Sequence, residues 1–252
     1  MNEEPKAALP RRHVPDPELA TLGGQTEARV SLGHAGNGLP TRATLDFALD
    51  HARARDAVYS SLDVDAIQAG LATRGRRAVE LESAARTRKI YLTRPDLGRS
   101  LDPDQMKRLA LGAPCDLVIV LADGLSAEAA NINAVPLAHA LLDRLEPSMS
   151  AAICIVRNGR VAIGDKIAIA LRAKAVIVLI GERPGLSASD SLGAYLTWTP
   201  KETTTDAQRS CVSNIRDGGL PPTAAADQLL SLLRKSQQLG YSGIAPTRMV
   251  TD

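Results

Sequence analysis

Three loops between residues 123 and 185 combine glycine with charged or hydroxyl side chains, a combination suited to ligand binding. They are residues 123–126, 157–161 and 181–185. Glycine lets backbone N–H groups approach a ligand closely, and the polar side chains can hydrogen-bond to it. None of the loops has the G-x-G-x-x-G spacing of a dinucleotide site or the G-x-x-x-x-G-K-[ST] pattern of a nucleotide hydrolase. The loops therefore predict a polar binding site, and they give no support to a pyrophosphate or triphosphate ligand.

The polar residues of these loops also have structural alternatives. Asp123 or Ser126 could cap a following helix. The Asn-Gly pair at residues 158–159 could form a hairpin-like turn. Glu182 directly follows an apolar run, so it is expected to meet either Arg183 or a ligand. The residues alone leave these alternatives open.

The cysteines and histidines give little sign of further chemistry. Three cysteines, far apart and without a CxxC pair, argue against a disulfide framework and against zinc. Cys115 and Cys154 belong to apolar segments and are interpreted as core residues. Cys211 is predicted to lie in a polar loop, which makes it the only cysteine that is a candidate site residue. The four histidines have no metal-ligand spacing, so we predict no metal site on this chain.

Alternating strand and helix patterns surround the three loops. Four apolar runs predict strands: 117–121, 151–156, 175–180 and 194–199. Helical periodicity predicts three helices: 126–144, interrupted at Pro136, then 163–171, and 223–240. The alternation predicts an α/β protein with a mostly parallel, Rossmann-like sheet flanked by helices and preceded by a helical N-terminal region. Ligands of such sheets bind beyond the carboxyl ends of the strands, where the three loops would lie.

The first part of the chain has helical patterns instead. An apolar stripe predicts a helix beginning at Thr41, and a weaker helix is predicted near Asp63. Asp102 before Pro103 marks the start of a third helix, with Gln105 placed to reach back to the cap. The resulting division is a loose N-terminal arm at 1–40, a helical N-terminal region at 41–112 and a Rossmann-like domain at 113–252.

Composition limits the partners and the compartment. With 30 basic and 28 acidic residues the net charge is +2, which argues against a nucleic-acid partner. Aromatic residues make up only 2% of the chain, so the core must consist mainly of Ala, Val, Ile and Leu. The best apolar run, 175–180, is too short to span a bilayer, and no secretory signal is recognised. We expect a protein that is cytoplasmic or enclosed within a cytoplasmic body.

Blocks throughout the sequence resemble the small subunit of ethanolamine ammonia-lyase. They occur in the same order and with similar spacing: 54–58, 91–99, 123–126, 156–165, 181–187, 190–195, 209, 211, 213–215 and 242–243. The long run from 181 to 195, followed by the block around Cys211, is the most specific. The resemblance covers roughly residues 28–245.

The resemblance implies a lyase that converts 2-aminoethanol to acetaldehyde and ammonia with adenosylcobalamin, whose radical abstracts hydrogen from the substrate. In the family the substrate pocket lies on a separate large subunit, which implies a hetero-oligomer in which this chain contributes no catalytic residue and is inactive alone. The positions that match the family's cobalamin contacts are Val161, Glu182 and Cys211. Val161 can pack on the apolar corrin face, and Glu182 can accept hydrogen bonds from corrin amides.

Two other classes of function compete with this interpretation. A nucleotide-binding, doubly wound oxidoreductase would need a glycine-rich first turn, which residues 123–126 do not supply. A non-catalytic assembly protein would not need three polar loops at one sheet edge. Residues 1–27 match no block of the family, which leaves enclosure in a bacterial microcompartment open.

Overall fold

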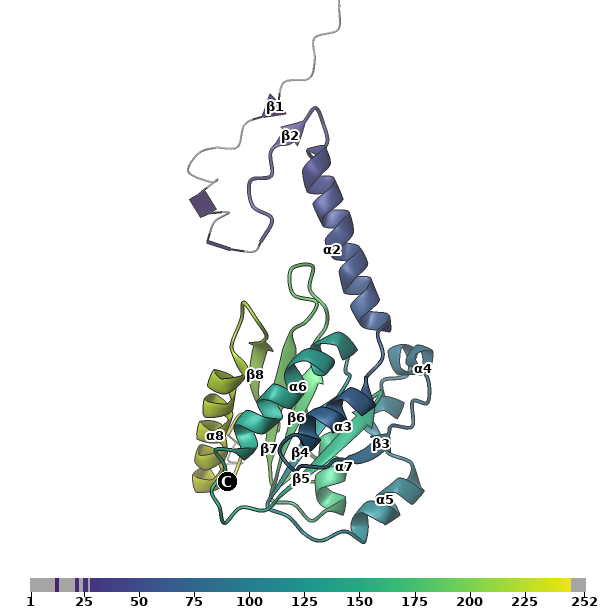
Figure 1. The fold of residues 1–252 in the computed structure, drawn as a ribbon, viewed down its shortest axis with the longest axis vertical. Coiled ribbons are helices and arrows are strands. Elements are labelled where there is room, and N and C mark those ends of the chain that lie inside the picture. The colour runs from purple at the N-terminus through teal and green to yellow at the C-terminus, as the bar shows by residue number, and fades with distance from the viewer. Residues whose placement is uncertain (1–11, 14–20, 23–24, 27, 246–252) are drawn as a thin grey trace, which may run out of the picture. The chain divides into compact units, whose positions relative to one another are not determined.

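The chain divides into two compact units. A computed structural model describes residues 12–13, 21–22, 25–26 and 28–245 (Figure 1). One unit comprises residues 1–55 and 185–188, and the larger one comprises residues 56–184 and 189–252. No helix in the described part of the chain is long and apolar enough to cross a membrane.

A six-stranded sheet lies at the centre of the larger unit. Its strands, in spatial order, are β3 (Val79–Glu82), β5 (Ala151–Arg157), β4 (Leu117–Ala122), β6 (Ala175–Gly181), β7 (Leu192–Trp198) and β8 (Ser210–Ile215). The first four are parallel, whereas β7 and β8 run antiparallel to their neighbours. The prediction of an α/β protein with a mostly parallel sheet is confirmed.

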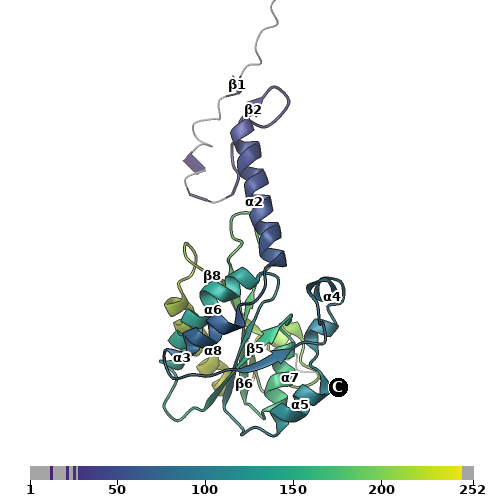
Figure 2. The same cartoon turned by 45° about the vertical axis from the view of Figure 1, so that its right-hand side comes forward.

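Helices cover both faces of this sheet (Figures 1 and 2). On one face lie α3 (Val64–Ala72), α6 (Ala127–Leu142) and α8 (Pro222–Leu239). On the other lie α5 (Pro103–Ala110) and α7 (Ile163–Ala170). Three short elements complete the unit: α4 (Arg88–Thr93) and the 3-10 turns η1 (Leu97–Arg99) and η2 (Asp206–Gln208).

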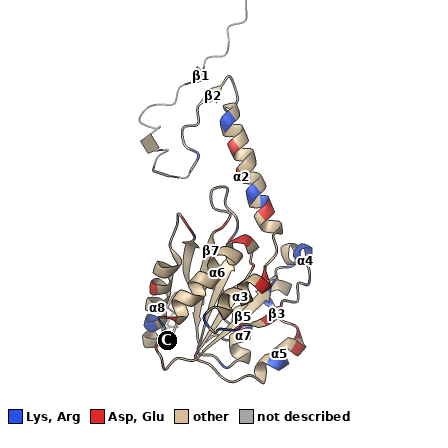
Figure 3. Ribbon diagram, in the orientation of Figure 1, with Lys and Arg blue, Asp and Glu red and all other residues tan. Residues whose placement is uncertain are grey.

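The smaller unit contains little regular structure besides one helix. Its elements are β1 (Arg12–His13), β2 (His34–Ala35) and most of α2 (Thr41–Tyr59). The helix predicted to begin at Thr41 is confirmed, but Leu45 and Leu49 of its apolar stripe are 64% and 50% exposed. Basic and acidic residues are interspersed along α2 (Figure 3), and Asp50 forms an ion pair with Arg29 at 2.5 Å. The prediction of a loose arm at 1–40 falls partly outside the described residues.

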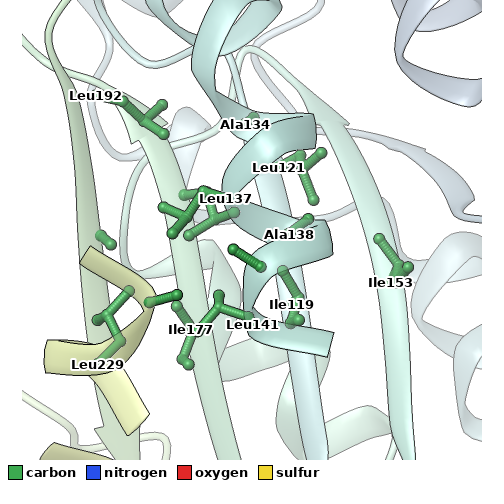
Figure 4. Close-up of a cluster of buried hydrophobic side chains, with 14 of the residues drawn as sticks. Ile119, Leu121, Ala134, Leu137, Ala138, Leu141, Ile153, Ile177, Leu192 and Leu229 are labelled. Atoms are coloured by element: carbon green, nitrogen blue, oxygen red, sulfur yellow. The ribbon is translucent and has the colours of Figure 1, made fainter. Parts of the chain in front are cut away.

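The core consists of small and branched aliphatic side chains, as the composition predicts. Successive residues of a strand point to opposite faces. In β4, Ile119 and Leu121 therefore pack under α6, while Val118 and Val120 pack under α7. Figure 4 shows residues of α6 against the strands at the first of these faces. Every residue of β4 is fully buried, which makes this strand a rigid support for the loop that follows it.

Several predictions of local structure were wrong. β3 lies inside the stretch predicted to contain only helices and loops, and β8 replaces the predicted polar loop around Cys211. Both are edge strands with partly exposed residues, so their apolar pattern is weak. α6 continues through Pro136, where an interruption was predicted. Gln105 does not reach back to cap α5; its Oε1 accepts a hydrogen bond from the backbone N–H of Glu82 at 2.9 Å.

Candidate functional site

The three polar loops meet at one edge of the sheet. β5, β4 and β6 are neighbouring parallel strands, so their carboxyl ends lie side by side. The loops that follow them begin at Asn158, Asp123 and Glu182. This is the edge at which an open parallel sheet binds its ligands.

Asp123 ties two of the loops together. Its buried carboxylate accepts hydrogen bonds from the backbone N–H groups of Asn158 at 2.9 Å and Gly159 at 3.1 Å. Burial raises the pKa of Asp123, while these hydrogen bonds and the nearby Arg88 guanidinium act in the opposite direction. The helix cap is Ser126, whose Oγ accepts a hydrogen bond from the N–H of Ala129 at 3.1 Å. Asp123 thus holds the loop after β5 and leaves the capping of α6 to Ser126.

The glycines of the site serve the chain's own packing. Gly124 has φ of +55°, a conformation that residues with a Cβ rarely adopt. The N–H of Leu125 donates to the carbonyl oxygen of Gly181 at 3.0 Å. A Cβ on Gly181 would overlap the carbonyl oxygen of Ser126. These two glycines allow the loops after β4 and β6 to pack closely against each other. The sequence pattern had instead predicted that the glycines let backbone groups approach a ligand.

Tyr91 lies between two arginines beside the loops. The guanidinium carbon atoms of Arg88 and Arg160 lie 4.7 and 4.2 Å from the centre of its ring. The ring is 1% exposed, and burial raises the pKa of the phenol to about 12, so it stays neutral. Arg160 Nη2 also donates to the carbonyl oxygen of Tyr91 at 3.1 Å. The stack fixes Arg160, which directly precedes Val161.

Glu182 is held in place by a hydroxyl group. Its Oε2 accepts a hydrogen bond from the Ser191 hydroxyl at 2.6 Å, and its backbone N–H donates to the carbonyl oxygen of Ser191 at 3.0 Å. Among the residues that the structure describes, Glu182 forms no ion pair with Arg183, so that alternative is not adopted. A Cβ on Gly193 would lie 2.8 Å from Glu182 Oε1, so glycine at this position leaves room for the carboxylate.

Cys211 lies on β8, in register with Tyr195 of β7. Burial raises the pKa of Cys211, the Tyr195 hydroxyl lowers it, and the nearby Glu182 carboxylate raises it; the net shift is upward. The thiol is therefore neutral near pH 7, and it is held by the sheet instead of a loop. Cys154 is fully buried in β5, as predicted for a core cysteine.

A buried ion pair supports this end of β8. Arg209 donates through Nη1 and Nη2 to the two carboxylate oxygens of Asp165 on α7, each at 2.7 Å. Nη1 also donates to Thr197 Oγ1 at 3.0 Å. Both members of the pair are buried. Sequence patterns did not predict this pairing; the available signal was an acidic residue in a helix whose only other charged residue is Lys166.

Two adjoining cavities open at these loops. The first, of about 390 Å³, is lined by Glu182, Leu125 and Ile180, among others. The second, of about 380 Å³, is lined by Cys211 and Arg99, among others. Both cavities are lined by three shared residues: Arg160, Val161 and Tyr195. The three predicted site residues Val161, Glu182 and Cys211, which are far apart in sequence, are thus brought to one continuous surface.

A mostly parallel sheet flanked by helices, with polar loops at the carboxyl ends of its strands, places the chain in the class of α/β proteins. Residues 16–245 match the family described as ethanolamine ammonia-lyase light chain. The chain belongs to this family of lyase subunits.

Curated relatives agree with the family match. An ethanolamine ammonia-lyase small subunit from Bradyrhizobium diazoefficiens is 48% identical over 243 residues, which cover 94% of this chain and 91% of the relative. One from Rhodopseudomonas palustris is 50% identical over 231 residues, or 90% and 88% of the two chains. One from Pseudomonas aeruginosa is 46% identical over 248 residues, or 92% and 89%.

Proposed function

We propose that this chain binds adenosylcobalamin as the small subunit of an ethanolamine ammonia-lyase and works with a larger catalytic subunit. The reaction is the conversion of ethanolamine to acetaldehyde and ammonia. One observation carries the proposal. Val161, Glu182 and Cys211, the positions that the resemblance assigns to cobalamin, come from three separate segments and line two adjoining cavities. Enclosure in a bacterial microcompartment stays a prediction.

The lining residues suit a corrin. Leu125, Val161 and Ile180 offer aliphatic side chains to an apolar ring face. Glu182 offers a carboxylate to the amides at its rim, and one of its oxygens is already fixed by Ser191. Each cavity is smaller than a whole cobalamin, so much of the cofactor must be covered by another surface. This size difference supports a partner subunit that closes over the cleft.

The chain's own residues bind and orient the cofactor. Adenosylcobalamin supplies the radical chemistry once it is bound. Glu182 accepts hydrogen bonds from corrin amides, Val161 packs against the ring, and the neutral Cys211 thiol allows the cofactor to lie close to β8. Tyr195 lines both cavities and, like Cys211, stays neutral because burial raises its pKa.

Reconstitution of the complex tests whether both subunits are needed for activity. Ammonia release from ethanolamine with adenosylcobalamin is measured for this chain alone, for its large subunit alone and for the mixture. Activity in the mixture alone is expected. A folded, co-purifying mixture without activity would overturn the proposal, and activity of this chain alone would contradict the role assigned to the large subunit.

A single substitution tests the binding surface. Glu182→Ala leaves corrin amides without an acceptor, and we expect it to weaken binding of cyanocobalamin to the reconstituted complex by about 1–3 kcal/mol. Glu146→Ala is the matched control, because Glu146 lies with Asp116 and Lys174 at the opposite, amino-terminal end of the strands. Equilibrium dialysis gives both affinities. Equal affinities for the two variants would remove Glu182 from the site.

A further inference from the structure

The second cavity is lined by three arginines, Arg99, Arg160 and Arg209, and by one carboxylate, Asp206, which is paired with Arg209 at 3.2 Å. Arg99 and Arg160 line it, and within residues 28–245 neither forms an ion pair with an acidic side chain. Two other arginines near the site are paired with carboxylates: Arg88 lies 3.8 Å from the Asp123 carboxylate, and Arg209 is paired with Asp165. Arg183 lines the first cavity only and forms no ion pair within residues 28–245. In the second cavity, two cationic groups therefore remain available to a ligand.

Arg160 is held ready for binding. Its guanidinium lies over the Tyr91 ring, its Nη2 is anchored to the Tyr91 carbonyl oxygen, and its backbone N–H donates to the carbonyl oxygen of Gly98 at 2.8 Å. Its Nε is buried without a hydrogen-bond partner in the described part of the chain. A fixed arginine loses little conformational entropy when it binds a planar or tetrahedral anion through two N–H groups.

Backbone groups add to the same cavity. Val161 and Ala162 line it just before the first turn of α7. Across the described residues, neither of their N–H groups donates a hydrogen bond to the protein. Ala162 has no side chain that could cap the helix. Free N–H groups at a helix amino terminus favour a negative charge, which reinforces the effect of the two arginines.

We propose that the second cavity is an anion subsite, in which Arg99, Arg160 and the amino terminus of α7 take the phosphodiester of the cobalamin nucleotide. The inference rests on the proposed function and divides the cleft in two. The cavity with Glu182 takes the neutral corrin amides, and the cavity with the two arginines takes the one phosphate group of the ligand. Glu182 lines the first cavity only and Arg99 the second only, so these two residues would also fix the direction in which the cofactor lies.

The test compares two ligands that differ in the phosphodiester. Cyanocobalamin carries the nucleotide, whereas cyanocobinamide lacks it. Their dissociation constants are measured by equilibrium dialysis on the reconstituted complex, for the wild type, Arg160→Met and Arg99→Met. We expect each variant to lose about tenfold affinity for cyanocobalamin and to bind cyanocobinamide like the wild type, since a charge-assisted hydrogen bond is lost for one ligand only.

Control variants distinguish loss of the anion subsite from a general loss of corrinoid affinity. Arg234→Met on α8, which covers the opposite face of the sheet, should change neither affinity. Arg99 is exposed, so its replacement tests the subsite even if Arg160→Met does not fold. Equal weakening of both ligands, or of neither, would overturn the subsite. So would inorganic phosphate that binds the second cavity without competing against cyanocobalamin. A wild-type complex that binds neither corrinoid would instead overturn the proposed function.

Discussion

The two faces of the central sheet are built differently. The face under α6 and α8 contains only aliphatic residues in its buried cluster. The face under α7 has a smaller cluster, includes Cys154, and adjoins the buried Asp165–Arg209 pair. α5 and α7 on this face have 8 residues each, whereas α6 has 16 and α8 has 18 on the other, so helices cover less of this face. The incomplete cover of the α7 face leaves Cys211 exposed and Tyr195 partly buried, and the proposed function assigns this surface to the cofactor.

The largest loss of stability is expected from a substitution that leaves a buried charge unpaired on the α7 side of the sheet. Arg209→Met leaves the Asp165 carboxylate buried without its partner, and we expect a loss of about 3–5 kcal/mol in the free energy of unfolding. Urea denaturation measures it. The double variant Arg209→Met/Asp165→Leu should recover most of this loss, because no charge then remains buried. A double variant as unstable as the single one would show that the packing of the Arg209 and Asp165 side chains, and not their charge, stabilises β8.

On the face under α6 and α8, truncation of a buried side chain is expected to lower the free energy of unfolding mainly because it leaves a cavity. Leu137 is fully buried between α6 and the sheet (Figure 4), and Leu137→Ala should cost about 2–5 kcal/mol. Leu239→Ala, at a position 50% exposed on α8, is the control and should have little effect. Urea denaturation compares the two. Weaker cofactor binding by a Leu137→Ala variant that is still fully folded would contradict the separation of the two faces.

A smaller loss is expected where the aliphatic face meets the cleft. Ser126→Ala removes the cap of α6 and the hydrogen bond that the hydroxyl donates to the carbonyl oxygen of Ser189 at 2.7 Å. Loss of a cap costs about 1 kcal/mol. Thermal denaturation should show this decrease, whereas Ser231→Ala on the exposed surface of α8 should not. A Ser126→Ala variant as stable as wild type would mean that neighbouring groups replace the cap.

The smallest expected effect is on the chemical reactivity of the Cys211 thiol and not on stability or binding. Because the pKa of Cys211 is raised, the reactive thiolate is scarce at neutral pH and increases only as the pH rises through the shifted value. Iodoacetamide labelling, followed by mass spectrometry, should therefore accelerate above about pH 8.5, the ordinary pKa of cysteine. Tyr195→Phe removes the hydroxyl that lowers the pKa of Cys211, so labelling at a fixed pH should slow. A labelling midpoint below the ordinary value would contradict this environment.

Sequence patterns predicted the centre of the sheet better than its edges. β4, β5 and β6 are buried on both faces and therefore appear as continuous apolar runs, which locate them within one or two residues. The short strand β3 has only one of its four residues buried, and β8 alternates irregularly between buried and exposed residues. Such strands are stabilised by their pairing partners, which a local pattern does not reveal.

The candidate site, like the sheet, could be predicted only in part from the sequence. The convergence of three loops followed from the parallel topology alone. The contacts that shape them did not, because Arg160 and Tyr91 are 69 residues apart and Arg209 and Asp165 are 44 apart. Each of these residues has an ordinary local sequence. Their pairing exists only after the sheet has formed.

The complete burial of β4 has a consequence for amide hydrogen exchange. β4 is hydrogen-bonded to a parallel strand on each side, and every residue in it is fully buried, so its amides can exchange only when the whole unit unfolds. β3, with Val79 51% exposed, can open locally at the sheet edge. The loop of Asp123 and Gly124 follows directly from β4. The floor of the cleft is thus attached to the slowest-exchanging part of the molecule, and its geometry persists for as long as the protein stays folded.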